Sequence, residues 1–130
     1  MQKLLLIAVA GGFGALARYG LAGAVQRWAD SVSASGAFFP WGTAAVNLVG
    51  CFFFGLLWVA LEERFSFSPD QRAIVLTGFM GAFTTFSTFM FETQKLLEDA
   101  QYLAALGNVA LQNGVGLVAV ILGLIVGRLI

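Results

Sequence analysis

Long apolar runs alternate with short polar stretches along this chain and divide it into four parts. The apolar runs cover about residues 4–26, 41–61, 71–96 and 102–128. A helix needs about 20 mostly apolar residues to cross a bilayer, and each run is long enough. We therefore predict an all-α membrane protein with one domain, residues 1–130, that contains four transmembrane helices.

The polar breaks carry signals for the start of new helices. The segment DSVSASGAFFP (30–40) ends in Pro40, which suits the first turn of a helix. In EERFSFSPDQ (62–71), Ser68 is expected as the N-cap, with Pro69 at the first position and Gln71 completing a capping box. The third break is KLLEDAQ (95–101), which is short and charged.

The first 17 residues also have the form of a signal peptide. Lys3 precedes an apolar run that ends in an Ala-x-Ala at residues 15–17. Because apolar character continues past Arg18 and glycines crowd the run, an uncleaved first membrane helix is favoured.

Composition supports the membrane class and removes several functions. Hydrophobic residues make up 59% of the chain and charged residues only 11%, with a mean hydropathy of +0.87, whereas soluble domains carry about 25% charged residues. The net charge is zero, so no basic patch indicates nucleic acid. With no histidine and a single Cys51, the chain lacks disulfides, Cys/His zinc sites and histidine acid–base chemistry. An enzyme is therefore not expected.

Polar residues inside membrane spans are costly and mark function by default. A helical wheel places small residues and one cation together on the first span, small and polar residues together on the second, and amides with glycines on the fourth. These sets are Gly11, Gly14, Ala15, Arg18 and Ala22; Thr43, Asn47, Gly50 and Phe54; and Asn108, Gln112, Gly116, Ala119, Gly123 and Gly127. Each set also fits ordinary helix packing, with Asn47 in a helix–helix hydrogen bond and Arg18 snorkelling to the interface.

The third span contains the densest polar cluster, GAFTTFSTF (81–89). On a continuous helix, small and polar residues would form one ladder and phenylalanines a second face. The ladder would be Gly78, Gly81, Thr85, Thr88 and Glu92. Glycines followed by two adjacent threonines are poor helix formers, so we predict a break near 81–84. A broken membrane helix frees backbone carbonyls that can coordinate a cation. The alternative is that the hydroxyls bond to the preceding turn and the rings face lipid.

The available donors indicate which ion such a site would accept. Hydroxyls, amides and the electropositive edges of phenylalanine rings favour a small, strongly hydrated anion over a cation or an apolar drug.

Loop charges give little orientation signal. Four basic residues fall on the side of the termini and two on the other, which is a weak positive-inside bias. The two groups are Lys3, Arg64, Arg72 and Arg128, against Arg27 and Lys95. Insertion in both orientations, and hence an antiparallel dimer, is one consequence that this balance allows.

Three segments in the expected order resemble the Fluc (CrcB-type) fluoride channels of bacteria over nearly the full chain. They are GGFGALARY (11–19), GTAAVNLVG (42–50) and TGFMGAFTTFSTFMFE (77–92). The resemblance implies a dual-topology, antiparallel homodimer in the lipid of the bacterial inner membrane. It further implies two pores for passive, fluoride-selective export and one central structural sodium ion.

The resemblance also implies roles for individual residues. Phe86 and Phe89 would direct ring edges at fluoride, and Asn47 would be the pore amide. Thr85, Ser87 and Thr88 would supply hydroxyls to the polar track, and Thr43 is a weaker candidate. Arg18 and Glu92 would be structural charges near the vestibule, and backbone carbonyls of Gly81 and Thr84 would bind sodium. The fourth span departs from the family pattern: Gly116 stands where a serine is common, and Gln112 where a tyrosine or histidine is, so Gln112 or Asn113 would compensate in the pore.

Two other functions fit a short four-span chain. A small multidrug-resistance-type, proton-coupled exporter needs a carboxylate in its first span, where this chain has Arg18. A non-transporting membrane assembly subunit predicts that Asn47 and the two phenylalanines tolerate apolar replacement.

Overall fold

The computed structural model describes residues 1–33 and 38–130, and the described chain is helical throughout apart from short connections. Residues 34–37, within the predicted loop at 30–40, lie outside the described residues. Four helical stretches are long and apolar enough to cross a membrane: Gln2–Val32, Trp41–Arg64, Pro69–Glu98 and Tyr102–Leu129. The predicted all-α fold with four potential membrane spans is confirmed.

Three of the four stretches contain π-helical turns, and the third also contains two residues of extended backbone. The elements are α1 (Gln2–Val32); α2 (Trp41–Val59) and π-helical η1 (Ala60–Arg64); α3 (Pro69–Arg72), π-helical η2 (Ala73–Met80), α4 (Gly81–Phe83) and α5 (Phe86–Glu98); and α6 (Tyr102–Ala110), π-helical η3 (Leu111–Val115) and α7 (Gly116–Leu129).

The start of the third stretch is fixed by the capping box that the sequence predicts. Ser68 Oγ accepts from the Gln71 N–H at 3.3 Å, while Gln71 Oε1 accepts from the Ser68 N–H at 2.9 Å. Pro69 occupies the first helical position, where its missing N–H is not needed. The short connection between η1 and α3 therefore ends at a defined residue.

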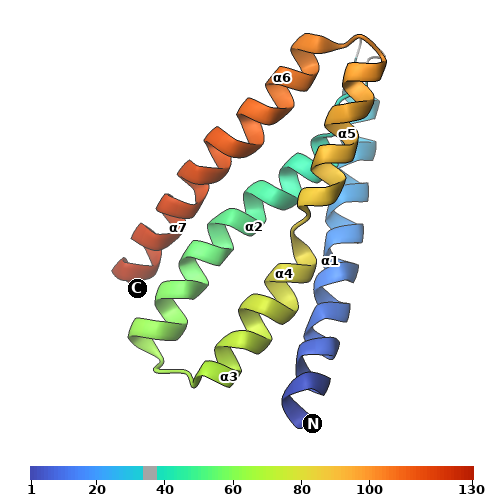
Figure 1. Ribbon diagram of the computed structural model, residues 1–130. Coiled ribbons are helices and arrows are strands. Elements are labelled where there is room, and N and C mark those ends of the chain that lie inside the picture. Colours follow the sequence, from blue (N-terminus) through green and yellow to red (C-terminus); the bar gives the residue numbers. More distant parts are fainter. Residues whose placement is uncertain (34–37) are drawn as a thin grey trace.

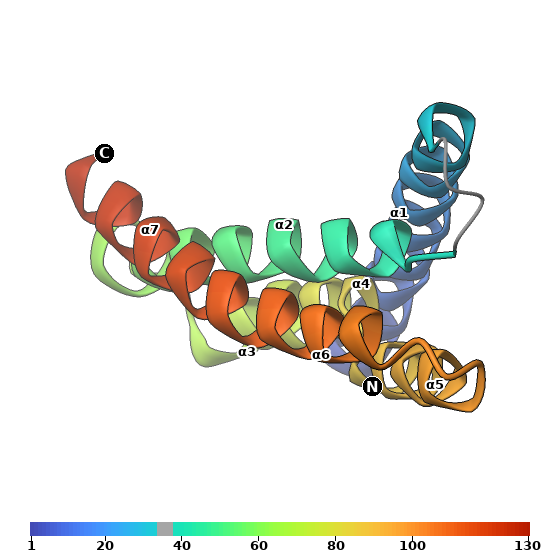
Figure 2. The same ribbon diagram turned by 90° about the horizontal axis from the view of Figure 1, so that it is seen from above.

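Helix α2 lies at the centre of the arrangement (Figures 1 and 2). It packs against α7 on one side and α1 on the other, while η2 and α4 lie along α1. Two glycines allow the α2–α7 backbones to approach closely, because a Cβ on Gly55 would overlap the Val120 carbonyl and one on Gly123 would overlap the Phe52 carbonyl. Lipid provides no hydrophobic driving force between membrane helices, so close backbone packing of this kind is what holds them together.

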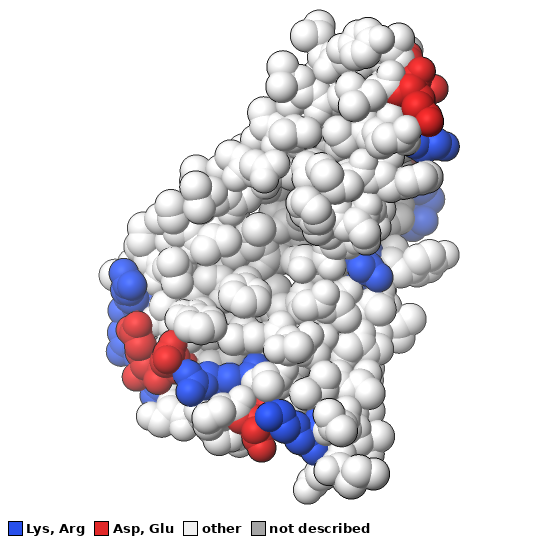
Figure 3. Space-filling model, viewed as in Figure 1, with Lys and Arg blue, Asp and Glu red and all other residues white. Residues whose placement is uncertain are grey.

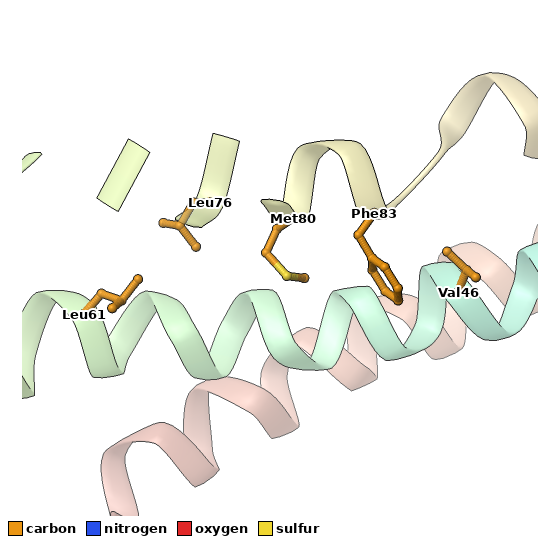
Figure 4. Close-up of a cluster of buried hydrophobic side chains, with 5 residues drawn as sticks. All are labelled: Val46, Leu61, Leu76, Met80 and Phe83. Atoms are coloured by element: carbon orange, nitrogen blue, oxygen red, sulfur yellow. The ribbon is translucent and has the colours of Figure 1, made fainter. Parts of the chain in front are cut away.

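The hydrophobic core of the single chain lies between the second and third stretches. Val46 and Leu61 project from α2 and η1 towards Leu76, Met80 and Phe83 on the facing elements (Figure 4). These five side chains are at most 9% exposed. Their packing holds η2 and α4 against α2, directly before the residues at which the third stretch departs from helical backbone.

Most charged side chains gather towards the two ends of the molecule, and the broad surface between them is uncharged apart from basic side chains along one edge (Figure 3). Large apolar side chains are exposed along the helices; Leu16 and Leu117, for example, are 69% and 63% exposed. Exposed apolar area of this extent is typical of a protein whose solvent is lipid.

Candidate functional site

The backbone leaves helical geometry at two threonines in the third stretch. Thr84 (φ −82°, ψ 159°) and Thr85 (φ −149°, ψ 113°) are extended between the end of α4 and the start of α5. Local side chains support both ends, because Thr84 Oγ1 donates to the Met80 carbonyl at 3.1 Å and Thr85 Oγ1 accepts from the Thr88 N–H at 3.3 Å. The Thr84 side chain thus bonds back to the last helical turn before the interruption, and the Thr85 side chain caps the N-terminus of α5.

Asn47 on α2 holds the extended backbone by two hydrogen bonds. Its Oδ1 accepts from the Thr85 N–H at 2.8 Å, and its Nδ2 donates to the Thr85 carbonyl at 3.0 Å. Nδ2 also donates to Gln112 Oε1 at 2.6 Å. Both amide protons of Asn47 are therefore bound within the protein, and this side chain acts on the backbone of the site.

The interruption removes helical donors from the carbonyls of residues 81–84, among them those of Gly81 and Thr84. In a continuous helix the Thr85 N–H would donate to Gly81 O and the Thr88 N–H to Thr84 O. Here these N–H groups donate to Asn47 Oδ1 and Thr85 Oγ1 instead. Both the Gly81 and the Thr84 carbonyl therefore lose a helical donor. Gly81 is exposed and Thr84 is half-buried, so both residues lie close to the surface of the chain.

A cavity of about 280 Å³ opens beside this backbone. Its lining combines three amide side chains with the two predicted phenylalanines: Asn47, Gly50, Cys51, Phe54, Thr84, Thr85, Phe86, Phe89, Gln112, Asn113 and Val120. The rings of Phe86 and Phe89 lie 5.7 Å apart, centroid to centroid, and are inclined at 62°. Phe89 is 3% exposed whereas Phe86 is 72% exposed, so the pair runs from the interior to the surface.

A second cavity, of about 370 Å³, lies across Thr85 from the first. It brings Arg18 of α1 together with Thr43, Thr85, Thr88 and Glu92. Thr43 Oγ1 donates to Glu92 Oε1 at 2.9 Å. Glu92 Oε2 is buried and has no hydrogen-bond partner among residues 1–33 and 38–130. Thr85 lines both cavities, so polar side chains line the space on both sides of the interruption.

The three hydroxyls predicted for a polar track occupy different positions. Thr85 is buried, and its Oγ1 donates to Thr88 Oγ1 at 2.9 Å. Thr88 lines the second cavity and is exposed at the surface of the single chain. Ser87 is also exposed and approaches the cluster through Thr85 Oγ1, at 3.4 Å.

The fourth stretch contributes amides to the first cavity. Gln112 lies in η3 and contacts Asn47 as described, while Nδ2 of the exposed Asn113 bonds back to the Val109 carbonyl at 2.8 Å. Gly116 faces α2, where an added Cβ would lie 3.6 Å from Cys51 Sγ. Of the two amides named as compensating for Gly116, Gln112 is the one that the structure joins to Asn47.

Two buried residues of the site were not identified as such from the sequence. Asn108 is fully buried and accepts from Gln112 Nε2 at 2.8 Å, and its own Nδ2 donates to Thr93 Oγ1 at 2.8 Å. The four-residue spacing of Asn108 and Gln112 on one helix face was a signal for the first. Thr93 lies outside the ladder of polar residues in its stretch and gave no such signal.

Comparison with known proteins gives one family for the whole chain. A family model described as "CrcB-like protein, Camphor Resistance (CrcB)" matches residues 5–124. A protein of Solidesulfovibrio magneticus is 53% identical over all of this chain and 99% of its own length. One of Nitrosococcus oceani is 50% identical, covering 99% of this chain and 98% of its own, and one of Nitratidesulfovibrio vulgaris is 51% identical over the whole of both chains. All three are named "Fluoride-specific ion channel FluC".

Proposed function

This chain belongs to the CrcB-like family, and we propose that it is a fluoride-selective channel that lets fluoride leave the cytoplasm passively through the inner membrane. The observation that carries the proposal is full-length similarity, at about half of all positions, to proteins named fluoride-specific ion channels. The four apolar helical stretches supply the multi-pass membrane protein that this function needs. Permeation is a binding and release process and requires no catalytic group.

The fluoride path runs along the polar side chains of the two cavities. Fluoride enters near Arg18, whose charge attracts anions, and passes the hydroxyl of Thr88, while the Thr43 hydroxyl donates to Glu92. It then crosses the interruption of the third stretch and meets the edges of Phe86 and Phe89 with Gln112 opposite. Ring edges carry partial positive charge and attract an anion without holding it tightly, and weak successive sites favour conduction.

The chain works as an antiparallel homodimer with two pores. Thr88, Ser87 and Phe86 are exposed on the single chain beside open cavities, and polar groups at membrane depth need protein or water around them. A second copy in the opposite orientation would cover them and close each path. The weak loop-charge bias permits both orientations.

A sodium ion held between the two copies suits the interrupted helices. The Gly81 and Thr84 carbonyls are among those at residues 81–84 that lose their helical donors at the interruption, and carbonyls of unwound membrane helices are sodium ligands in transport proteins. One pair of carbonyls from each copy would provide four oxygens. When bound, the ion would neutralise these carbonyl dipoles and add positive charge near the anion paths.

We predict that replacing sodium destabilises the dimer. Purified protein dialysed into a large organic cation should show a lower melting temperature and more monomer by size exclusion than protein kept in sodium. Returning sodium should reverse both changes, because the carbonyls regain a partner. Equal melting curves in the two solutions would remove Gly81 and Thr84 from an ion-binding role.

The conduction test uses protein reconstituted in liposomes loaded with potassium fluoride. We expect valinomycin to release fluoride rapidly, as read by a fluoride electrode, whereas chloride-loaded vesicles followed by a chloride electrode should release almost none. Protein-free vesicles give the background rate. Fluoride efflux at that background rate would refute the proposed function, and equal fluoride and chloride rates would refute its selectivity.

A further inference from the structure

A continuous line of hydrogen-bonded side chains links the third and fourth stretches behind the first cavity. From the Phe89 carbonyl it passes through Thr93 Oγ1 (2.7 Å), Asn108 (2.8 Å) and Gln112 (2.8 Å) to Asn47 (2.6 Å). We call Thr93, Asn108, Gln112 and Asn47 the amide relay. Asn108 is 0% exposed and the other members of the relay are buried or half-buried, so water does not compete for these bonds.

The Phe89 carbonyl sets the direction of the whole relay. A carbonyl only accepts, so Thr93 must give its single hydroxyl proton to Phe89 O. Thr93 Oγ1 can then only accept, which turns the NH₂ group of Asn108 towards it and leaves Asn108 Oδ1 facing Gln112. Gln112 must therefore present Nε2 to Asn108 and Oε1 to Asn47.

The opposite end of the relay requires the same direction independently. The Thr85 N–H fixes Asn47 Oδ1, and the Thr85 carbonyl fixes Asn47 Nδ2. Asn47 thus offers a donor, not an acceptor, to Gln112 Oε1. Two backbone anchors on different sides of the site agree, so the alternative orientation of each amide would break at least one buried bond.

This direction decides which amide proton remains for an ion. Asn47 donates one proton to the Thr85 carbonyl and the other to Gln112. Gln112 Nε2 donates one proton to Asn108, and no group in the described part of the chain accepts its second. Gln112 lines the first cavity together with Phe86 and Phe89, and it lies in the π-helical segment η3, a form often found at functional sites.

We propose that Gln112 is the amide donor to the anion in the first cavity, and that Thr93 and Asn108 are positioning residues that hold its NH₂ group in the donating orientation. The proposal rests on the proposed fluoride function. It assigns the amide contact with the anion to the fourth stretch, beside the ring edges of Phe86 and Phe89, and makes Asn47 the residue that holds the Thr85 backbone. It also gives roles to two residues, Thr93 and Asn108, that lie behind the cavity wall.

The test compares Thr93→Val with Thr93→Ser in the liposome efflux assay. Valine keeps the shape but cannot accept from Asn108, so both amides are free to turn, and we expect fluoride efflux to fall about tenfold. Serine keeps the hydroxyl, and its efflux should stay within about twofold of wild type. Size exclusion and melting curves establish that equal amounts of assembled protein are compared.

Thr77→Val is the matched control, since Thr77 is an exposed threonine in the same stretch outside the relay; its efflux should equal that of wild type. Efflux of Thr93→Val at the wild-type rate, or an equal loss in Thr93→Ser, would overturn the proposal.

If Thr93→Val does not assemble, the Gln112→Glu variant provides the test. Glutamate keeps an acceptor for Asn47 but has no amide donor, so wild-type efflux overturns the proposal and loss of efflux supports it. Wild-type protein without fluoride efflux would instead refute the proposed function itself.

Discussion

Replacing either Phe86 or Phe89 by isoleucine is expected to stop fluoride efflux almost completely in the liposome assay. Isoleucine keeps apolar bulk but has no ring edge to face an anion that has left water. A desolvated cation over an aromatic face is worth about 2 kcal/mol. The same magnitude for an anion at the ring edge corresponds to about a 30-fold fall in rate for each ring. Phe89→Ile should have the larger effect, because that ring is 3% exposed whereas Phe86 is 72% exposed, so water competes less for a contact with Phe89.

The control for ring loss lies on the other side of the interruption. Phe79 stacks on Phe83 with centroids 6.0 Å apart and an interplanar angle of 8°, and Phe79 packs against the hydrophobic core. Phe79→Ile removes an aromatic pair of comparable size from the same stretch, so it should lower the melting temperature but conserve fluoride efflux per dimer. If the Phe86 and Phe89 variants behaved like Phe79→Ile, both rings would belong to packing.

The apolar pattern was sufficient to predict the number of helices, because spans of about 20 apolar residues have few alternatives in a chain with so little charge. Local sequence was also sufficient to predict the capping box at Ser68, because Ser68, Pro69 and Gln71 all favour a helix start at the same residue. Composition at Gly81–Thr85 indicated poor helix formers. The extended residues in the structure are Thr84 and Thr85, where the Asn47 amide competes with the helical hydrogen bonds. That competition comes from another helix and is invisible in local propensity.

The helical wheel placed Asn47 on one stripe with Thr43 but could not show which groups accept the amide protons of Asn47. Thr43 bonds to Glu92 and Asn47 bonds to Thr85 and Gln112, so neighbours on one helix face serve two separate cavities. Thr93 illustrates the same limit more strongly. Its value to the site comes from Asn108, fifteen residues away in sequence, and no spacing rule within one helix joins them.

The residue whose loss should affect both stability and conduction is Asn47. Asn47→Leu removes the partners of the Thr85 N–H, the Thr85 carbonyl and Gln112 Oε1 in one step. Leaving buried polar groups unsatisfied costs about 1–3 kcal/mol each, so we expect a loss of about 3 kcal/mol or more in stability. Fluoride efflux should fall to background, because the extended backbone at Thr85 joins the two cavities and then has no support. Chemical denaturation and liposome efflux measure the two effects.

A second amide provides the comparison that separates these effects. Gln26 on α1 also binds backbone twice, since its Oε1 accepts from the Gly42 N–H at 3.0 Å and its Nε2 donates to the Phe39 carbonyl at 3.1 Å. Gln26→Leu should therefore lose stability while the remaining folded dimers conduct at the wild-type rate. Asn47→Asp is the complementary variant, because it keeps an acceptor for the Thr85 N–H but loses both donors. If Asn47→Asp conducts normally, the bonds to the Thr85 carbonyl and Gln112 are dispensable; if it fails while Gln26→Leu conducts, the pore depends on the donors of Asn47 at this position.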